Sequence, residues 1–269
     1  MKPTVRLLSL VCVIGGVTVS EARADNSYSV GVEGFRDAYK EYCVDGAGVD
    51  PKVDIHTDYG SVTASYQHTA GSYFTAIDGR YSQGDADYKS LSGTINNISD
   101  KEGEARLRFG ANMVAWHGIV MPYIGVGARL FFDQGKGMFS SIGAEAYDRH
   151  ITQLYAPLGV TYQFNWGSWV FRPNAEVDAL FWGKVESHLG EVRGNYNVEN
   201  TQHGGVGLRG EFMAGQQYKY FGWEIGPFVR YWHVDASDIV STPATPPGTG
   251  LEEPKNARLQ VGGALRVNF

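Results

Sequence analysis

The sequence predicts an all-β protein, a single ten-stranded antiparallel transmembrane β-barrel with short periplasmic turns and long extracellular loops. Three observations predict it. Apolar and polar side chains alternate through ten segments, long and short connections take turns between them, and the chain ends on an aromatic residue. Because successive side chains of a strand point to opposite faces, each segment has one apolar face and one polar or small face.

The alternation is plainest in the last eleven residues, LQVGGALRVNF. One face carries Leu259, Val261, Gly263, Leu265, Val267 and Phe269. The other face carries Gln260, Gly262, Ala264, Arg266 and Asn268. The segment therefore predicts a final strand whose apolar edge ends in Phe269.

The first 24 residues read as a secretory signal peptide, cut before Asp25. Lys2 and Arg6 precede the apolar run LLSLVCVIGGVTV, which is shorter than the roughly 20 residues of a membrane-spanning helix. The expected organisation is thus a signal peptide over 1–24 and one barrel domain over 25–269.

Charge and cysteine content exclude several classes of function. Of the 23 Lys and Arg and 29 Asp and Glu residues, three basic and one acidic residue leave with the signal peptide, so the mature charge changes from −6 to −8. This balance argues against a nucleic-acid partner. Cys12 also leaves and Cys43 remains alone, so no internal disulfide is expected, and no spacing suggests a metal site or a cofactor.

Ten strands account for the mature chain. We expect them near 27–38, 57–68, 72–84, 102–115, 119–133, 151–164, 169–184, 203–216, 221–236 and 257–269. The long connections are expected at 39–56, 85–101, 134–150, 185–202 and 237–256, and the short ones are TAG, WHG, NWGS and QYKY. Long loops at one end and tight turns at the other are typical of membrane barrels rather than soluble sandwiches.

All six tryptophans fall at expected strand ends or turns. Amphipathic rings at these positions indicate two girdles at the level of the lipid headgroups. Trp116, Trp166, Trp169 and Trp223 belong to the short-turn side, and Trp182 and Trp232 to the long-loop side.

The signal peptide, the strand count and the terminal Phe269 resemble those of the small, porin-like outer-membrane β-barrels of Gram-negative bacteria. This resemblance covers the whole mature chain as a pattern. It implies a location in the outer membrane and contacts with outer-membrane lipid and lipopolysaccharide. It also implies that the barrel-assembly machinery recognises the C-terminal strand, and that the protein is a monomer.

The polar faces of the strands define an expected lumen in which every basic residue is an arginine. Its charged residues are Glu33, Asp78, Arg80, Glu104, Arg106, Arg108, Arg129, Asp133, Arg172, Glu176, Asp178, Arg209, Glu211, Glu224, Arg230, Arg258 and Arg266. Guanidinium groups can bind two carboxylates at once, so we expect ion pairs such as Glu176 with Arg209 and Glu224 with Arg266. A mostly plugged lumen is favoured, and a narrow polar pore is the alternative.

Two acidic motifs stand where expected strands run into long loops. Asp85 and Asp87 follow the third strand, and Glu186 and His188 follow the seventh, where a carboxylate two residues from a histidine suits a general base. These two motifs resemble the catalytic pairs of the omptin proteases. The local sequence before the second motif is also similar to that family, over the stretch YAPLGVTYQFNWGSWVFRPNAEVDALFWGKVESH. That resemblance implies that these four residues activate a water, although Glu186 stands where the family has an aspartate and Ala86 where it has an aromatic residue.

Strand parity separates the two motifs. Glu186 and His188 continue the lumen-facing set, whereas Asp85 and Asp87 continue the lipid-facing set unless a bulge near Gly84 turns them inward. The alternative without a catalytic role is that all four are solvated polar residues.

Three classes of function stay open at this point. The first is a small porin-like or ligand-binding barrel, with a charge-plugged or narrow lumen. The second is an omptin-like endopeptidase, and the third is a surface adhesion protein that acts through its loops.

Overall fold

The computed structural model describes residues 24–42, 51–246 and 249–269. The predicted signal peptide before residue 24 and Cys43 lie outside the described residues. Almost all described secondary structure is β-strand, with one short 3₁₀ turn, Leu189–Glu191. No helix in this part of the chain is long and apolar enough to cross a membrane.

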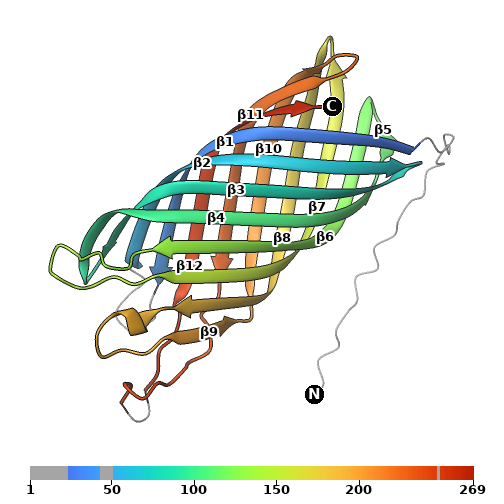
Figure 1. Cartoon of the computed structure of the whole chain (residues 1–269). Coiled ribbons are helices and arrows are strands. Elements are labelled where there is room, and N and C mark those ends of the chain that lie inside the picture. Colours follow the sequence, from blue (N-terminus) through green and yellow to red (C-terminus); the bar gives the residue numbers. More distant parts are fainter. Residues whose placement is uncertain (1–23, 43–50, 247–248) are drawn as a thin grey trace, which may run out of the picture.

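Ten long strands close into one antiparallel barrel (Figure 1). Hydrogen bonding follows the chain from β1 to β4, then β6, β7, β8, β10, β11 and β12, and β12 pairs back onto β1. The ten strands are β1 Ala24–Tyr42, β2 Pro51–Ala70, β3 Tyr73–Ser90, β4 Gly93–Ala111, β6 Gly118–Gln134, β7 Arg149–Trp166, β8 Trp169–Ser187, β10 Gly205–Gln217, β11 Gly222–Val234 and β12 Lys255–Asn268. Two short extensions, β5 Met113–Ala115 and β9 Val198–Gln202, pair with β6 and β8.

The terminal aromatic residue lies at the seam of the barrel. The Phe269 amide donates to the Tyr28 carbonyl at 2.8 Å, and the Tyr28 amide donates to the Phe269 carbonyl at 3.1 Å. Ser29 then pairs with Asn268, and the register continues along β1 and β12 to Tyr42 and Lys255. The alternating C-terminal segment is therefore the closing strand of the barrel.

The outer face is apolar around the whole circumference. Each of the ten strands exposes large apolar side chains there, including Val30, Val62, Ile77, Phe109, Ile124, Leu158, Val177, Leu208, Ile225 and Val261. In a soluble protein such a continuous surface would be costly, whereas a lipid bilayer solvates it. The fold is thus a transmembrane barrel with its apolar faces outward.

The strands are longer than a bilayer requires. The 20 residues of β2 rise by roughly 3.3 Å each, so the strand is about twice as long as the ~30 Å hydrocarbon layer, and tilting accommodates only part of the difference. Beyond the apolar belt the outer face becomes charged, as at the Arg36–Asp58 ion pair, where both side chains are 72% exposed. The barrel therefore rises above the membrane at the end opposite the start of β1 and the end of β12.

The long connection predicted over 85–101 was wrong. β3 continues to Ser90 and β4 begins at Gly93, so only Leu91 and Ser92 form the tip of this hairpin. The interior positions at this height are the buried residues Ala86, Ile95 and Ile98. Polar residues of this segment such as Asp85, Asp87, Asn96 and Asn97 are exposed to water on the hairpin, whereas Asp100 is buried.

The girdle predicted from the tryptophans is correct in part. Trp116, Trp166 and Trp169 are exposed at the short-turn end, with exposed fractions of 85%, 77% and 39%. Trp232, however, is only 2% exposed and points into the barrel, because it shares the inward parity of Phe228 and Arg230 on β11. It is an interior residue and not part of a girdle.

Candidate functional site

The centre of the barrel is filled by large side chains. We call Glu102, Arg129, Tyr155, Trp232 and Gln260 the central layer, and each is at most 2% exposed. Arg129 lies over the Trp232 ring at 4.5 Å, and Tyr155 meets the same ring edge-on at 5.2 Å. The Gln260 side-chain amide donates to Glu102 at 2.9 Å. The layer is therefore an aromatic and ion-paired block across the lumen.

Arg209 joins the central layer to the carboxylates below it. Its guanidinium donates to Asp178 at 2.7 Å and lies 3.1 Å from Glu176, and it also binds Glu104. The expected pairing of Arg209 with Glu176 is confirmed by the register of β10 and β8. Tyr155 donates to Glu104 at 2.5 Å, so one carboxylate links the arginine and the aromatic residue.

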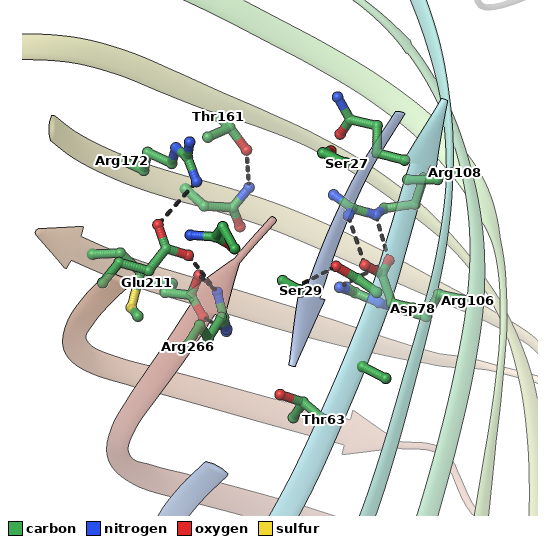
Figure 2. Close-up of a pocket in the computed structure, with 18 of the residues that line it drawn as sticks. Ser27, Ser29, Thr63, Asp78, Arg106, Arg108, Thr161, Arg172, Glu211 and Arg266 are labelled. Carbon is green, nitrogen blue, oxygen red and sulfur yellow. Dashed lines mark hydrogen bonds and ion pairs between the residues drawn. The ribbon is translucent and has the colours of Figure 1, made fainter. Parts of the chain in front are cut away.

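Further ion pairs line the interior toward the short-turn end (Figure 2). Arg80 bridges Glu102 and Glu104 at 2.7 and 3.1 Å. The other pairs are Arg106–Glu176 at 3.0 Å, Arg108–Asp78 at 2.6 Å, Arg172–Glu224 at 2.9 Å, Arg230–Glu33 at 2.8 Å and Arg266–Glu211 at 2.5 Å. The structure thus places the predicted charged residues in the lumen, opposite one another. Glu224 and Arg266 are direct register partners, 3.8 Å apart, as predicted.

Two separate cavities flank the central layer. The lower cavity, at the short-turn end, has a volume of about 490 Å³, and the upper cavity, at the long-loop end, about 370 Å³. They share no lining residue. Between them, beside Arg129 and Trp232, lies a small cavity of about 10 Å³. This volume is at the lower limit of what one water molecule needs. The central layer therefore lies between two large cavities that are lined by different residues.

The upper cavity has apolar walls and a charged floor. Ile55, Ala86, Ile95, Ile98, Val198 and Leu251 are among its wall residues. The floor is formed by Glu41, Asp100, Asp133, Arg149, Glu253 and Arg258. We call this cavity the upper cup.

Arg149 organises one side of the floor. It donates to Glu41 at 2.9 Å through Nη1, to Asp133 at 2.9 Å through Nε, and to Glu253 at 3.1 Å. Arg258, on the other side, lies 3.8 Å from Asp37 and over the Phe131 ring at 4.1 Å. The two arginines close the cup toward the central layer.

The last residues of the connection between β11 and β12, 251–254, line the upper cup and bring Glu253 to its floor. The Asn200 side-chain amide donates to the carbonyls of Asp238 and Leu251, both at 3.0 Å, and holds this connection to β9. Burial raises the pKa of Glu253 to about 7, against the opposing charge of Arg149 and with the added effect of Glu41. Glu253 is therefore a titratable contact between a loop and the barrel wall.

The predicted acidic pair after the third strand faces outward. Asp85 and Asp87 flank Ala86, which is 2% exposed and points inward, so the two carboxylates lie on the outer surface of β3. A bulge is present, but it is in β4 opposite Asp87, where Asn97 has φ of 59°. The Asn97 amide donates to Asp87 at 3.3 Å, which gives Asp87 a role in holding this bulge.

The predicted inward position of Glu186 and His188 was wrong. Between Leu154 and Tyr155 of β7 the register skips Phe181, so β8 has one extra residue there. From that point Gly183, Val185 and Ser187 are the buried residues, and Glu186 and His188 point outward.

On the outer surface these two residues find local partners. Glu186 pairs with Lys184 at 2.7 Å, and His188 packs on His150 with ring centroids 4.8 Å apart. Three long strands, β4, β6 and β7, separate this pair from Asp85 and Asp87 on β3. The structure therefore does not bring the four omptin-like candidates together.

Several interior residues were missed by sequence reasoning. Asp37, Glu41, Asp100, Glu102 and Arg149 all face the lumen but lie beyond or near the ends of the expected strands. The alternation continues through them in β1, β4 and β7, and this was the signal that could have identified them. Glu253 lies in the connection between β11 and β12, where no alternation of side chains indicates which residues face the lumen.

No described group of three or more His, Cys, Asp or Glu residues is placed to hold a metal ion.

No family model matches the sequence, and no curated protein matches it. Solved structures do match. The outer-membrane protease OmpT of Escherichia coli superposes with a TM-score of 0.62 at 8% identity, covering 94% of this chain and 99% of that chain.

Two other barrels superpose less well. The translocator domain of the autotransporter NalP from Neisseria meningitidis has a TM-score of 0.42 at 11% identity, covering 90% of this chain and 88% of that chain. The Pseudomonas putida toluene transporter TodX has a TM-score of 0.34 at 8% identity, covering 90% and 89%. Only the first likeness is strong enough to use, and it shows the barrel fold alone.

Proposed function

We propose that this protein is an outer-membrane barrel that does not conduct and that binds a small ligand in its upper cup. The observation that carries this proposal is the central layer, which separates two blind cavities with side chains that are at most 2% exposed. A cavity of about 370 Å³ with apolar walls and a few polar groups is of the size and kind that holds small molecules.

The outer membrane is the membrane that fits the molecule. Bacterial outer membranes hold single-chain barrels with short periplasmic turns, an apolar belt and taller outer ends, and the fold is that of an outer-membrane protein. The short-turn end, where β1 begins and β12 ends, then faces the periplasm, and the upper cup faces outward. Lipopolysaccharide would surround the outer part of the belt, and the barrel-assembly machinery would engage the strand that ends in Phe269. A monomer suffices, since the sheet has no open edge.

A pore is less well supported than a plug. Arg209 binds both Glu104 and Asp178, and all three side chains are less than a tenth exposed, so displacing one for a passing solute would leave a buried unpaired charge. The outward positions of Asp85, Asp87, Glu186 and His188 likewise give no support to an endopeptidase built on them. No specific observation on the described loops supports an adhesion function.

Planar-bilayer recording tests the plug. We expect no steady current steps from the wild type, and small steps from the Arg129→Ala, Trp232→Ala double variant, in which two central side chains are truncated. Trp166→Ala, which truncates an exposed ring at the short-turn end, is the matched control and stays silent. Reproducible wild-type steps at low voltage would contradict the proposal.

Thiol labelling gives an independent measure of separation. With Cys43 replaced by serine, cysteines are introduced at Ser187, which lines the upper cup, or at Ser65, which lines the lower cavity. A membrane-impermeant thiol reagent added outside whole cells is expected to label Ser187→Cys and to spare Ser65→Cys. Labelling of both positions from outside would show a continuous lumen.

A further inference from the structure

The upper cup is an acidic compartment. Six carboxylates line it, against two guanidinium groups, and its lining includes neither lysine nor histidine. The carboxylates are Glu41, Asp100, Asp133, Glu145, Glu252 and Glu253, and the guanidinium groups are Arg149 and Arg258. A cleft lined by one sign of charge concentrates ligands of the opposite sign.

Two of these carboxylates face each other across neighbouring strands. Asp100 of β4 and Asp133 of β6 are direct register partners, and both line the cup. Like charges directly opposite on one face of a sheet destabilise the pairing unless a counter-charge lies between them. Asp133 receives one from Arg149, at 2.9 Å.

Asp100 has no such partner. It is 3% exposed, and its Oδ1 accepts no hydrogen bond from any described residue. No described basic group lies within ion-pair distance of Asp100, whereas the deeper carboxylates Glu102 and Glu104 each bind an arginine. A buried carboxylate oxygen without a donor is costly, so this oxygen is open to a donor from a bound molecule.

The walls above this carboxylate are apolar and partly aromatic. Ala86, Ile95 and Ile98 form a packed cluster there, against which Ile55, Tyr88 and Ala146 pack. Tyr88 and Tyr147 also line the cup, and tyrosine rings attract organic cations through their faces. A hydrated inorganic ion would gain nothing from such walls, whereas an apolar chain would be buried by them.

We propose that the upper cup binds a small amphipathic cation, an alkyl- or arylammonium compound, whose charged head donates to Asp100 and Asp133 and whose apolar tail packs on the Ile95 and Ile98 wall. This inference deepens the proposed function and rests on it. The head would supply the counter-charge that Asp100 lacks, and the acidic residues Glu145 and Glu252 would favour its entry.

The test is calorimetric titration of the full-length mature protein in lipid nanodiscs at neutral pH, with protein-free nanodiscs as the blank. The probes are hexylammonium, hexanoate, which reverses the charge, and ethylammonium, which shortens the tail. We expect saturable binding of one hexylammonium per barrel, with hexanoate and ethylammonium each roughly 10-fold weaker or worse.

Asp100→Asn is the deciding variant. We expect it to weaken hexylammonium binding by roughly 10- to 100-fold, the usual loss when a charge-assisted hydrogen bond becomes neutral. Asp85→Asn is the matched control, because it removes the same charge from the outer face of β3 and should leave binding unchanged. Retention of heat-modifiable electrophoretic mobility establishes that each variant is folded.

The outcomes separate this inference from the proposed function. Equal binding of hexanoate and hexylammonium, or unchanged affinity in Asp100→Asn, would overturn the cation assignment while the barrel stays non-conducting. Steady channel currents would instead overturn the proposed function. Equal binding of ethylammonium and hexylammonium would remove the role of the apolar wall and would also overturn the inference.

Discussion

The guanidinium of Arg129 lies 4.5 Å from the ring of Trp232, and both side chains line the cavity of about 10 Å³ between the two larger ones. Neither side chain is more than 2% exposed. Trp232→Ala should therefore leave a cavity and lower the free energy of unfolding by about 3–5 kcal/mol, as expected for a buried tryptophan. Urea unfolding in lipid vesicles measures this change, with the exposed Trp166→Ala as the control. An equal, small effect of both substitutions would mean that the central layer is loosely packed.

The Arg209 network should be sensitive to the shape of its donor. Arg209→Met leaves Glu104, Glu176 and Asp178 without their shared arginine, and breaking buried pairs of this kind costs about 3–5 kcal/mol of unfolding free energy. Arg209→Lys should restore only part of it, because an ammonium lacks the planar fork. The exposed pair offers the comparison, since Arg36→Met should have little effect on stability. A full rescue by lysine would contradict the shared-fork geometry.

Glu253 should make stability depend on pH. Its pKa is about 7 in the folded protein against an ordinary 4.5, so the folded state binds this proton more tightly than the unfolded state. The contribution is complete below pH 4.5 and is lost as the pH rises through 7, amounting to about 3 kcal/mol. Unfolding measured across this window should show a decline that Glu253→Gln abolishes. Glu252→Gln, at the exposed neighbouring position, should keep the wild-type slope.

The outer-surface position of the omptin-like candidates has a direct consequence for peptide cleavage. Asp85→Ala and His188→Ala should not change the rate at which lipopolysaccharide-reconstituted protein cleaves a peptide with paired basic residues. Peptide mass spectrometry measures this rate. Loss of a robust wild-type cleavage in either variant would restore the endopeptidase hypothesis and require a rearranged rim.

Phe269 should matter for assembly more than for the stability of the finished barrel. Its ring is 60% exposed, although its backbone closes the seam with Tyr28. Phe269→Ser should lower the amount of folded barrel in the outer-membrane fraction several-fold, whereas Phe221→Ser, at another exposed aromatic residue of the same end, should not. Normal insertion of Phe269→Ser would argue against recognition of the terminal residue.

Sequence periodicity predicted the ten strands and the closing strand, because a lipid-facing side chain and a lumen-facing side chain must alternate wherever the ladder is regular. The predicted side-chain directions were wrong where the register between β7 and β8 shifts by one residue. The extra residue at Phe181 reverses the parity of Glu186 and His188, and no local composition marks it. The predicted third and fourth strands were also too short. Near Asp100 the outer face of these strands contacts water, so it lacks the apolar residues by which a strand was recognised.

The interior pairs were predictable in kind but not in partner. Direct register partners such as Arg209 and Glu176 follow from counting along neighbouring strands. Pairs between strands that are not neighbours, such as Arg230 with Glu33 or Arg106 with Glu176, depend on shear and on side-chain length, which counting does not supply. Glu253 reaches the floor of the upper cup from a loop, and only the folded chain shows this.

The hairpin tip at Leu91 and Ser92 has a practical consequence. The ladder between β3 and β4 stays paired as far as Ser90 and Gly93, and Leu91 is 85% exposed beyond it. A peptide epitope grafted between these two residues would stand on a stiff stalk above the cell envelope. The barrel could therefore serve as a scaffold for displaying such peptides to antibodies.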